Sequence, residues 1–123
     1  MPKGRVLIDT SSIIFAMQNR KDIFSITRTV FPGCEICVSQ GVISELRRIS
    51  FGKTKKGRNA ATGLLALHHN NISIERDKQL PDEWMANASS NGHIFVTNDT
   101  KLWHILKSQG KRAAKLSIDG RIV

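Results

Sequence analysis

Two hydrophobic patterns alternate along this chain. Short apolar runs without polar alternation are typical of strands that are covered on both faces of a parallel sheet. They occur at residues 5–9, 34–38, 72–74, 94–97 and 116–118. Apolar residues spaced three or four positions apart predict helices at residues 13–17, 22–30, 42–49, 60–69, 81–91 and 102–109. This alternation predicts an α/β fold with a central, mainly parallel sheet of four or five strands and the first strand in the middle.

The chain has no repeats, low-complexity tracts or linkers, and its 123 residues suit one domain with one core. We therefore expect residues 1–123 to form a single domain. Residues 51–59 interrupt the alternation, because they contain two glycines and four basic residues but no acid. We expect this segment to be a mobile loop, since few apolar side chains offset the entropy of ordering it.

Basic residues outnumber acidic ones, with 19 Lys and Arg against 10 Asp and Glu and a net charge of +9. Such an excess favours contact with polyanions, although a basic protein can also be merely soluble. No apolar run approaches the ~18 residues of a membrane span, so we expect no membrane partner. The first residues resemble no secretion signal, which predicts a cytoplasmic protein. Nucleic acid is the partner that the charge favours.

Four of the acidic residues fall where a parallel sheet would gather them. Asp9 ends the first strand and Asp99 follows the fourth, and ligands bind beyond the carboxyl ends of such strands. Glu45 lies on the helix after the second strand, and Asp82 begins the helix before the fourth. Four gathered carboxylates would hold Mg²⁺ or Mn²⁺, which lowers the pKa of a bound water and polarises a phosphate oxygen. The pattern therefore indicates a metal-dependent nuclease.

Each acid also has an ordinary structural explanation. Asp82 and Asp99 could be stabilising acids at helix N-termini, and Glu45 could pair with Arg47 or Arg48 on its own helix. Asp9 is the hardest to explain in this way, because an unused acid at the end of a buried strand is destabilising.

The motifs occur in the order VLIDTS, SQGVISEL, DEWMANA and IFVTNDTKL, at residues 6–11, 39–46, 82–88 and 94–102. In this respect the chain resembles the PIN-domain nuclease family along essentially its whole length. The resemblance implies a three-layer α/β/α fold and metal-dependent cleavage of single-stranded RNA. It also implies that the catalytic and metal-binding acids are Asp9, Glu45, Asp82 and Asp99.

The resemblance further implies that Thr10, Ser11, Thr97 and Asn98 order the site. Ser11 departs from the family, since many members carry Asn at this position. Within the family, the chain is similar to small archaeal proteins that resemble the eukaryotic PIN endonucleases of small-subunit pre-rRNA processing. Two alternatives stay open: a VapC-type toxin ribonuclease, and a non-catalytic RNA-binding factor in ribosome assembly.

A group of basic side chains lies at the end of the Glu45 helix and in the segment that follows it, and is expected to bind RNA phosphates without reading sequence. Its members are Arg47, Arg48, Lys53, Lys55, Lys56 and Arg58. The alternative is a solvated segment that only aids solubility. Trp84 and Trp103 lie at helical core spacing, so strong base stacking is not indicated. The sequence leaves open a homodimer.

Two other motifs have weaker functional explanations. Cys34 and Cys37 have the CxxC spacing of zinc and redox sites, but they fall within a predicted strand, so we interpret them as structural. The segment Gly52-Lys53-Thr54 lacks the leading glycine of a phosphate-binding P-loop, because position 47 is Arg, and it follows a helix.

Overall fold

The protein is described here by a computed structural model of residues 4–123. Its centre is a five-stranded sheet in which every pairing is parallel, with the order β3-β2-β1-β4-β5. The strands are β1 (Arg5–Ile8), β2 (Glu35–Ser39), β3 (Ser73–Glu75), β4 (His93–Val96) and β5 (Arg112–Ala114). The predicted parallel sheet with the first strand in the middle is confirmed. Residues 1–3, where the absence of a secretion signal was expected, lie outside the described residues.

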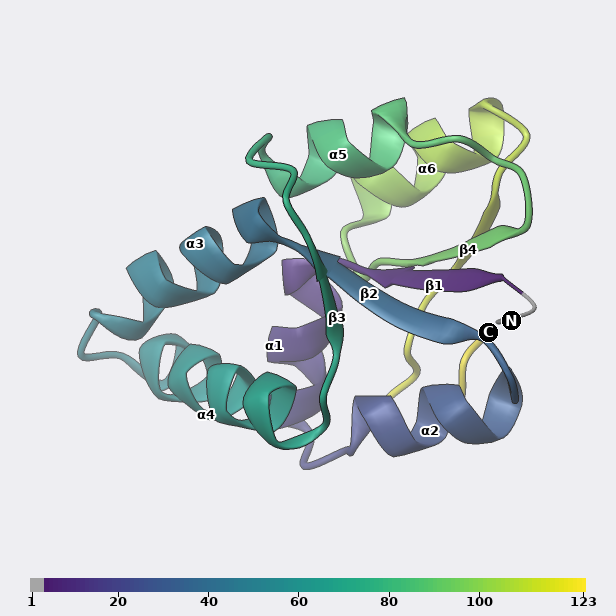
Figure 1. The fold of residues 1–123 in the computed structure, drawn as a ribbon. Helices are drawn as coiled ribbons and strands as arrows, with labels where there is room; N and C mark the ends of the chain where they lie inside the picture. Colours follow the sequence, from purple (N-terminus) through teal and green to yellow (C-terminus); the bar gives the residue numbers. More distant parts are fainter. Residues whose placement is uncertain (1–3) are drawn as a thin grey trace.

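Helices cover both faces of this sheet (Figure 1). They are α1 (Thr10–Gln18), α2 (Ile23–Val30), α3 (Gln40–Ser50), α4 (Lys55–His69), α5 (Pro81–Asn87) and α6 (Thr100–Ser108). Figure 1 shows α5 and α6 on one side of the sheet and α1, α2 and α4 on the other. The helix α3 leaves the carboxyl end of β2 and packs mainly against α4. The predicted three-layer α/β/α arrangement is confirmed.

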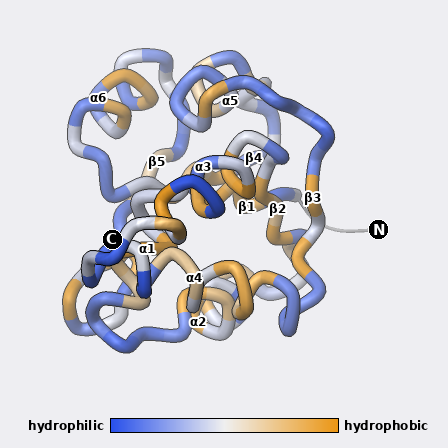
Figure 2. Tube along the Cα trace, turned by 90° about the vertical axis from the view of Figure 1, so that its left-hand side faces the viewer, coloured by the Kyte–Doolittle hydropathy of each residue, from blue (hydrophilic) through white to orange (hydrophobic). Residues whose placement is uncertain are grey.

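The hydrophobic core is built around the strands whose apolar runs contain no alternating polar residues. Val6, Leu7 and Ile8 are at most 2% exposed, because helices pack on both faces of β1. Figure 2 shows the hydrophobic positions concentrated on the central strands and the hydrophilic ones along the connections. Within the part of the chain that the structure describes, no helix combines the length and the apolar character needed to cross a membrane.

The prediction of a loop at residues 51–59 is wrong beyond Thr54, because α4 begins at Lys55. Gly57 does not break the helix. A Cβ at this position would clash with the backbone oxygen of Gly52, so the glycine lets the first turn of α4 approach the preceding turn closely. Lys55, Lys56 and Arg58 are therefore held on a helix.

Two predicted elements at the C-terminal side of the chain also differ. The last strand is β5 at Arg112–Ala114, so the prediction of a strand at residues 116–118 is wrong. Leu116 makes only an isolated β-bridge with Ile122. The strand was missed because the small Ala113 fills the buried position beside Phe95. The helix α5 ends at Asn87, because Ala88 is already extended.

Candidate active site

The four predicted acids line one cleft at the carboxyl edge of the sheet. Asp9 follows β1, Asp99 follows β4, Glu45 lies in the second turn of α3, and Asp82 lies in the first turn of α5. The cleft has a volume of about 410 Å³, and Ser11 and Lys56 also line it. Segments that are up to 90 residues apart in the chain thus converge, since parallel strands end at the same edge. An apolar wall completes the cleft and consists of Leu80, Pro81 and Leu102.

Asp9 is the buried centre of this cleft, with only 5% of its surface exposed. Its Oδ2 accepts hydrogen bonds from Ser11 Oγ at 2.7 Å and from Thr97 Oγ1 at 2.8 Å. Burial raises the pKa of the Asp9 carboxyl, and these two hydrogen bonds oppose that rise. The nearby charge of Glu45 raises the pKa further. Asp9 is therefore a desolvated carboxyl in a site where a cation would stabilise the ionised form.

The same hydroxyls hold the segment that follows β4. Ser11 Oγ accepts from the backbone N–H of Asn98 at 3.0 Å, and Thr97 Oγ1 accepts from that of Asp99 at 3.1 Å. Asn98 Oδ1 accepts from Ser12 Oγ at 2.7 Å, which ties α1 to the same segment. The hydroxyls of Ser11 and Thr97 thus link Asp9 to the backbone that carries Asp99.

Thr10 stands apart from this network of side chains. Its hydroxyl is buried and has no hydrogen-bond partner among the described residues. Its backbone N–H does bond the Asp9 carboxylate, which lowers the pKa of that carboxyl. Ser11, Thr97 and Asn98 are thus joined by hydrogen bonds around Asp9, whereas Thr10 contacts Asp9 only through its backbone; that these four residues order the site stays a prediction.

The other three acids are more accessible. Asp99 caps α6, because its Oδ1 accepts from the backbone N–H of Leu102 at 3.0 Å. Asp82 is exposed, and its Oδ1 accepts from the neighbouring backbone N–H of Glu83 at 2.9 Å. Glu45 is half-buried. Asp99 thus does lie at a helix N-terminus, as its structural explanation requires, yet within the described residues only its Oδ1 accepts a hydrogen bond.

No basic side chain neutralises these acids in the part of the chain described. The ion pairs there are Arg5–Glu35, Arg5–Glu75 and Arg121–Asp119, all outside the cleft, so the alternative pairing of Glu45 with Arg47 or Arg48 is not found. Among residues 4–123, no three His, Cys, Asp or Glu side chains are close enough to ligate one ion as they stand. The donor set still suits Mg²⁺ or Mn²⁺, because it consists of carboxylate oxygens with a desolvated Asp9 at its centre.

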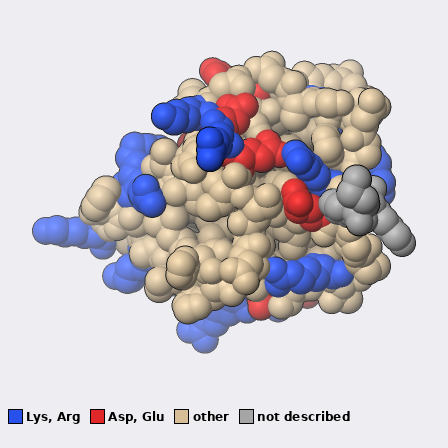
Figure 3. Space-filling model, in the orientation of Figure 1, with Lys and Arg blue, Asp and Glu red and all other residues tan. Residues whose placement is uncertain are grey.

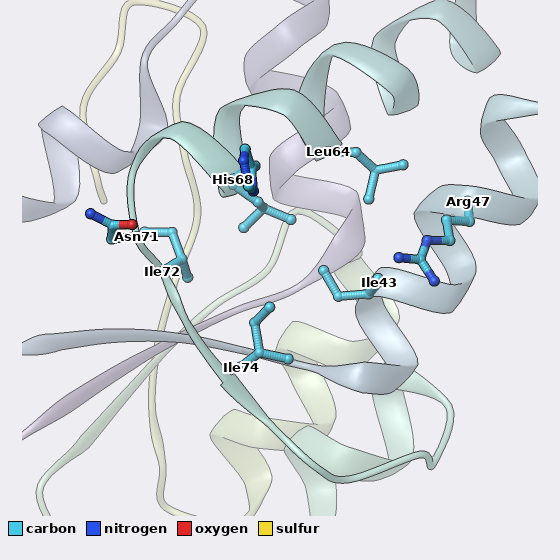
Figure 4. A pocket seen from close by; sticks show the side chains of 8 residues that line it. Ile43, Arg47, Leu64, His68, Asn71, Ile72 and Ile74 are labelled. Carbon is cyan, nitrogen blue, oxygen red and sulfur yellow. The ribbon is translucent and has the colours of Figure 1, made fainter.

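The predicted RNA-binding residues do not all face this cleft. Figure 3 shows Lys and Arg side chains at the end of the molecule where α3 and α4 lie. Lys56 lines the acidic cleft, and both Lys55 and Lys56 line a neighbouring hollow. Arg47 instead lines a largely apolar hollow between α3, α4 and β3, beside Ile43, Leu64 and Ile74 (Figure 4). The remaining three are exposed and line none of these cavities: Arg48, Lys53 and Arg58.

The two cysteines are free thiols. The prediction that both lie within a strand is wrong for Cys34, because β2 begins at Glu35. Cys37 is buried in β2, and burial raises the pKa of its thiol to about 12, helped by the nearby Glu35 carboxylate. A thiol of that pKa is almost wholly protonated at neutral pH, so Cys37 is a poor nucleophile.

The place of Lys56 and the apolar wall were missed by the sequence reasoning. Lys56 was assigned to a loop, so nothing in its immediate neighbourhood signalled that it reaches the acids. Leu80 is 61% exposed in the structure. In the sequence, a leucine placed directly before Pro81 and Asp82 is the one signal that could have indicated the wall.

No family model matches the sequence, and no curated protein matches it significantly. Solved structures do match. The structure of the PIN domain endonuclease Utp24 is 19% identical with a TM-score of 0.79, covering 99% of this chain and 92% of that one. A domain of a functionally unknown protein from Methanocaldococcus jannaschii is 18% identical with a TM-score of 0.60, covering 93% and 91%. VapBC-1 from nontypeable Haemophilus influenzae is 14% identical with a TM-score of 0.55, covering 89% and 96%. At these identities the likeness concerns the fold, and the predicted PIN-like fold is confirmed.

Proposed function

We propose that residues 1–123 act as one metal-dependent endoribonuclease domain that hydrolyses phosphodiester bonds of single-stranded RNA. One observation carries the proposal: four carboxylates from distant segments line a single cleft and form no ion pair within residues 4–123, although the chain has a net charge of +9. Gathered carboxylates repel one another, so a cation is the physical reason to keep them together. The PIN fold of a protein described as an endonuclease supports the same conclusion.

In this proposal Asp9 and Asp99 are the core ligands of Mg²⁺ or Mn²⁺, and Asp82 and Glu45 bind directly or through water. A bound ion supplies a water of lowered pKa and a polarised phosphate oxygen. Ser11 and Thr97 hold Asp9 in one orientation by hydrogen bonds of 2.7 and 2.8 Å, so one ligand is fixed before the ion arrives. Asp82 and Asp99 are exposed, and their side chains can rotate to complete the coordination.

The substrate class follows from charge and shape. Phosphates are drawn by the basic side chains, of which Lys56 stands at the cleft itself. Among residues 4–123, no aromatic side chain lines the cleft, so these residues supply no stacking platform there. We therefore propose that cleavage is not strongly sequence-selective at the scissile phosphate and that a partner, or the folded context of the RNA, adds specificity.

Calorimetry with Mn²⁺ tests the metal site. The wild type should bind with an affinity that falls sharply in Asp9→Asn and Asp99→Asn. Glu83→Gln is the matched control, because Glu83 neighbours Asp82 and is exposed, yet does not line the cleft. Equal Mn²⁺ affinity in all four proteins would overturn the metal site.

For the biological role we propose processing of an rRNA precursor, on the sequence resemblance to pre-rRNA-processing PIN proteins. Cleavage of a small-subunit rRNA precursor at a defined position is the expected result. A toxin ribonuclease is the alternative, since VapBC-1 shares the fold. Arrest of growth on expression, relieved by Asp99→Asn, would favour that alternative.

A further inference from the structure

A second hollow adjoins the acidic cleft. It has a volume of about 230 Å³ and lies between α1 and α4, which pack side by side (Figure 1). Its lining consists of Ile14 and Gln18 from α1 and Lys55, Lys56 and Asn59 from α4. Lys56 lines both hollows, so the two adjoin at this one side chain.

The chemistry of this hollow is the reverse of that in the cleft. No carboxylate lines it, and two ammonium groups do. Among the described residues, neither lysine forms an ion pair. Gln18 is exposed and Asn59 is half-buried, and their side-chain amides bond no other group of the described chain, so both are free to meet a ligand. Two cations, two unbonded amides and one branched apolar side chain match a nucleotide, which offers a phosphate, a hydrogen-bonding base edge and a flat apolar face.

We propose that this hollow is a nucleotide-binding subsite for the residue next to the scissile phosphate. This inference rests on the proposed nuclease function. Lys56 and Lys55 hold the phosphate that follows the scissile one, and the base lies against Ile14 with its edge hydrogen-bonded by Gln18 and Asn59. Carboxylates then face the reacting phosphate, and lysines face its neighbour.

Two consequences follow for substrate choice. A base in a duplex presents its Watson–Crick edge to its partner strand, so only an unpaired nucleotide can occupy the subsite with that edge on the amides. Each amide combines a donor and an acceptor group, which fit some bases better than others. The subsite therefore selects single strands and imposes a base preference at one position beside the cut.

The test measures binding of labelled single-stranded homopolymers of the four bases to metal-free protein, so that no cleavage occurs. The expected result is unequal affinity for the four in the wild type. The double variant Gln18→Ala with Asn59→Ala should reduce the differences in affinity among the four homopolymers. The salt dependence of RNA binding should not change. Equal affinities in the wild type, or an unchanged inequality in the double variant, would overturn the role of the amides.

The role of Lys56 is tested by measuring RNA affinity, which should fall equally for all four homopolymers when this lysine is replaced. Lys56→Ala should weaken binding of all four homopolymers and reduce the slope of log affinity against log salt by about 0.7, the value for one phosphate of a single strand. Lys56→Arg should restore both. The matched control is Lys53→Ala, a lysine three residues away that lines neither hollow. Equal losses in Lys56→Ala and Lys53→Ala would overturn the subsite, since general charge would then explain the binding.

These outcomes are distinct from failure of the proposed function. If the wild type binds as expected but cleaves no RNA in Mn²⁺, the subsite holds as an RNA-binding site and the nuclease function is wrong. If it cleaves RNA but all variants bind like the wild type, the nuclease function holds and the subsite is wrong.

Discussion

Asp9→Asn should stabilise the folded protein without metal and leave it less stable than the wild type when metal is present. Asparagine keeps the shape of the side chain and an oxygen that can accept from Ser11 and Thr97, but it removes the buried charge. The pKa of the Asp9 carboxyl is raised by burial, so ionised Asp9 destabilises the folded protein at pH values above that pKa. The destabilisation should decline as the pH falls below the folded pKa and should be absent below the lower pKa of the unfolded chain. Without metal at neutral pH, the variant should therefore be the more stable protein.

The magnitude follows from two opposing contributions. Burying one ion costs several kcal/mol, and each of the two hydrogen bonds to the charged oxygen returns about 1.5–3 kcal/mol, which leaves a net cost on the order of 1 kcal/mol. For a domain of this size that corresponds to a rise in Tm of roughly 4 °C in metal-free Asp9→Asn. Mn²⁺ at 100 times its Kd stabilises the folded wild type by about 2.7 kcal/mol, or roughly 10 °C. The Tm of Asp9→Asn should rise far less on addition of Mn²⁺.

Thermal melts in EDTA and in Mn²⁺, followed from acidic to neutral pH, measure both effects. Glu83→Gln, which removes a charge outside the cleft, should respond to Mn²⁺ like the wild type. The reasoning is refuted if metal-free Asp9→Asn is less stable than the wild type at neutral pH and Mn²⁺ raises the Tm of both proteins equally.

Three further predictions concern the parts around the site. Gly57→Ala should lower stability by about 1–3 kcal/mol, seen as a lower Tm, because the added methyl meets the Gly52 carbonyl, whereas an unchanged Tm would mean that the turn adapts freely. Iodoacetamide at mildly alkaline pH should leave Cys37 unmodified in the folded protein, since the pKa of its buried thiol is raised to about 12; rapid modification of Cys37 detected by mass spectrometry would contradict its burial. Ser11→Ala should reduce the cleavage rate and the Mn²⁺ affinity by about 10–100-fold, because Ser11 hydrogen-bonds a metal ligand. The affinity for RNA without metal should not change. Full cleavage activity would show that Thr97 alone orders Asp9.

The fold was predictable where local pattern and long-range packing agree. Val6, Leu7 and Ile8 form a run that only a strand covered on both faces would carry, and β1 is the middle strand. The edge strand β5 was not predictable in this way, because Arg112 and Ala114 have no strand pattern and pair only as neighbours of β4. Gly57 was misread for a related reason: its role is a close approach to Gly52, which a local pattern cannot reveal.

The candidate site was likewise predictable only in part. Asp9 and Asp99 were predictable because each directly follows a strand, and parallel strands end at one edge. The bond between Thr97 and Asp9 depends on the register that pairs Ile8 with Val96, and register is a property of the folded sheet. Lys56 reaches the cleft only because α4 packs against α1 and α3, a contact between helices that the sequence does not encode locally.

Cleavage of a labelled single-stranded RNA in Mn²⁺ and in EDTA tests the central claim most directly. The wild type should cleave internally in Mn²⁺ and lose this activity in EDTA. Asp9→Asn and Asp99→Asn should reduce the rate in Mn²⁺ by about 100-fold or more, since even an outer partner of a metal ligand contributes about 10–100-fold. Cleavage that is equally fast in EDTA, or equally fast in Asp99→Asn purified free of other nucleases, would contradict the metal-dependent mechanism.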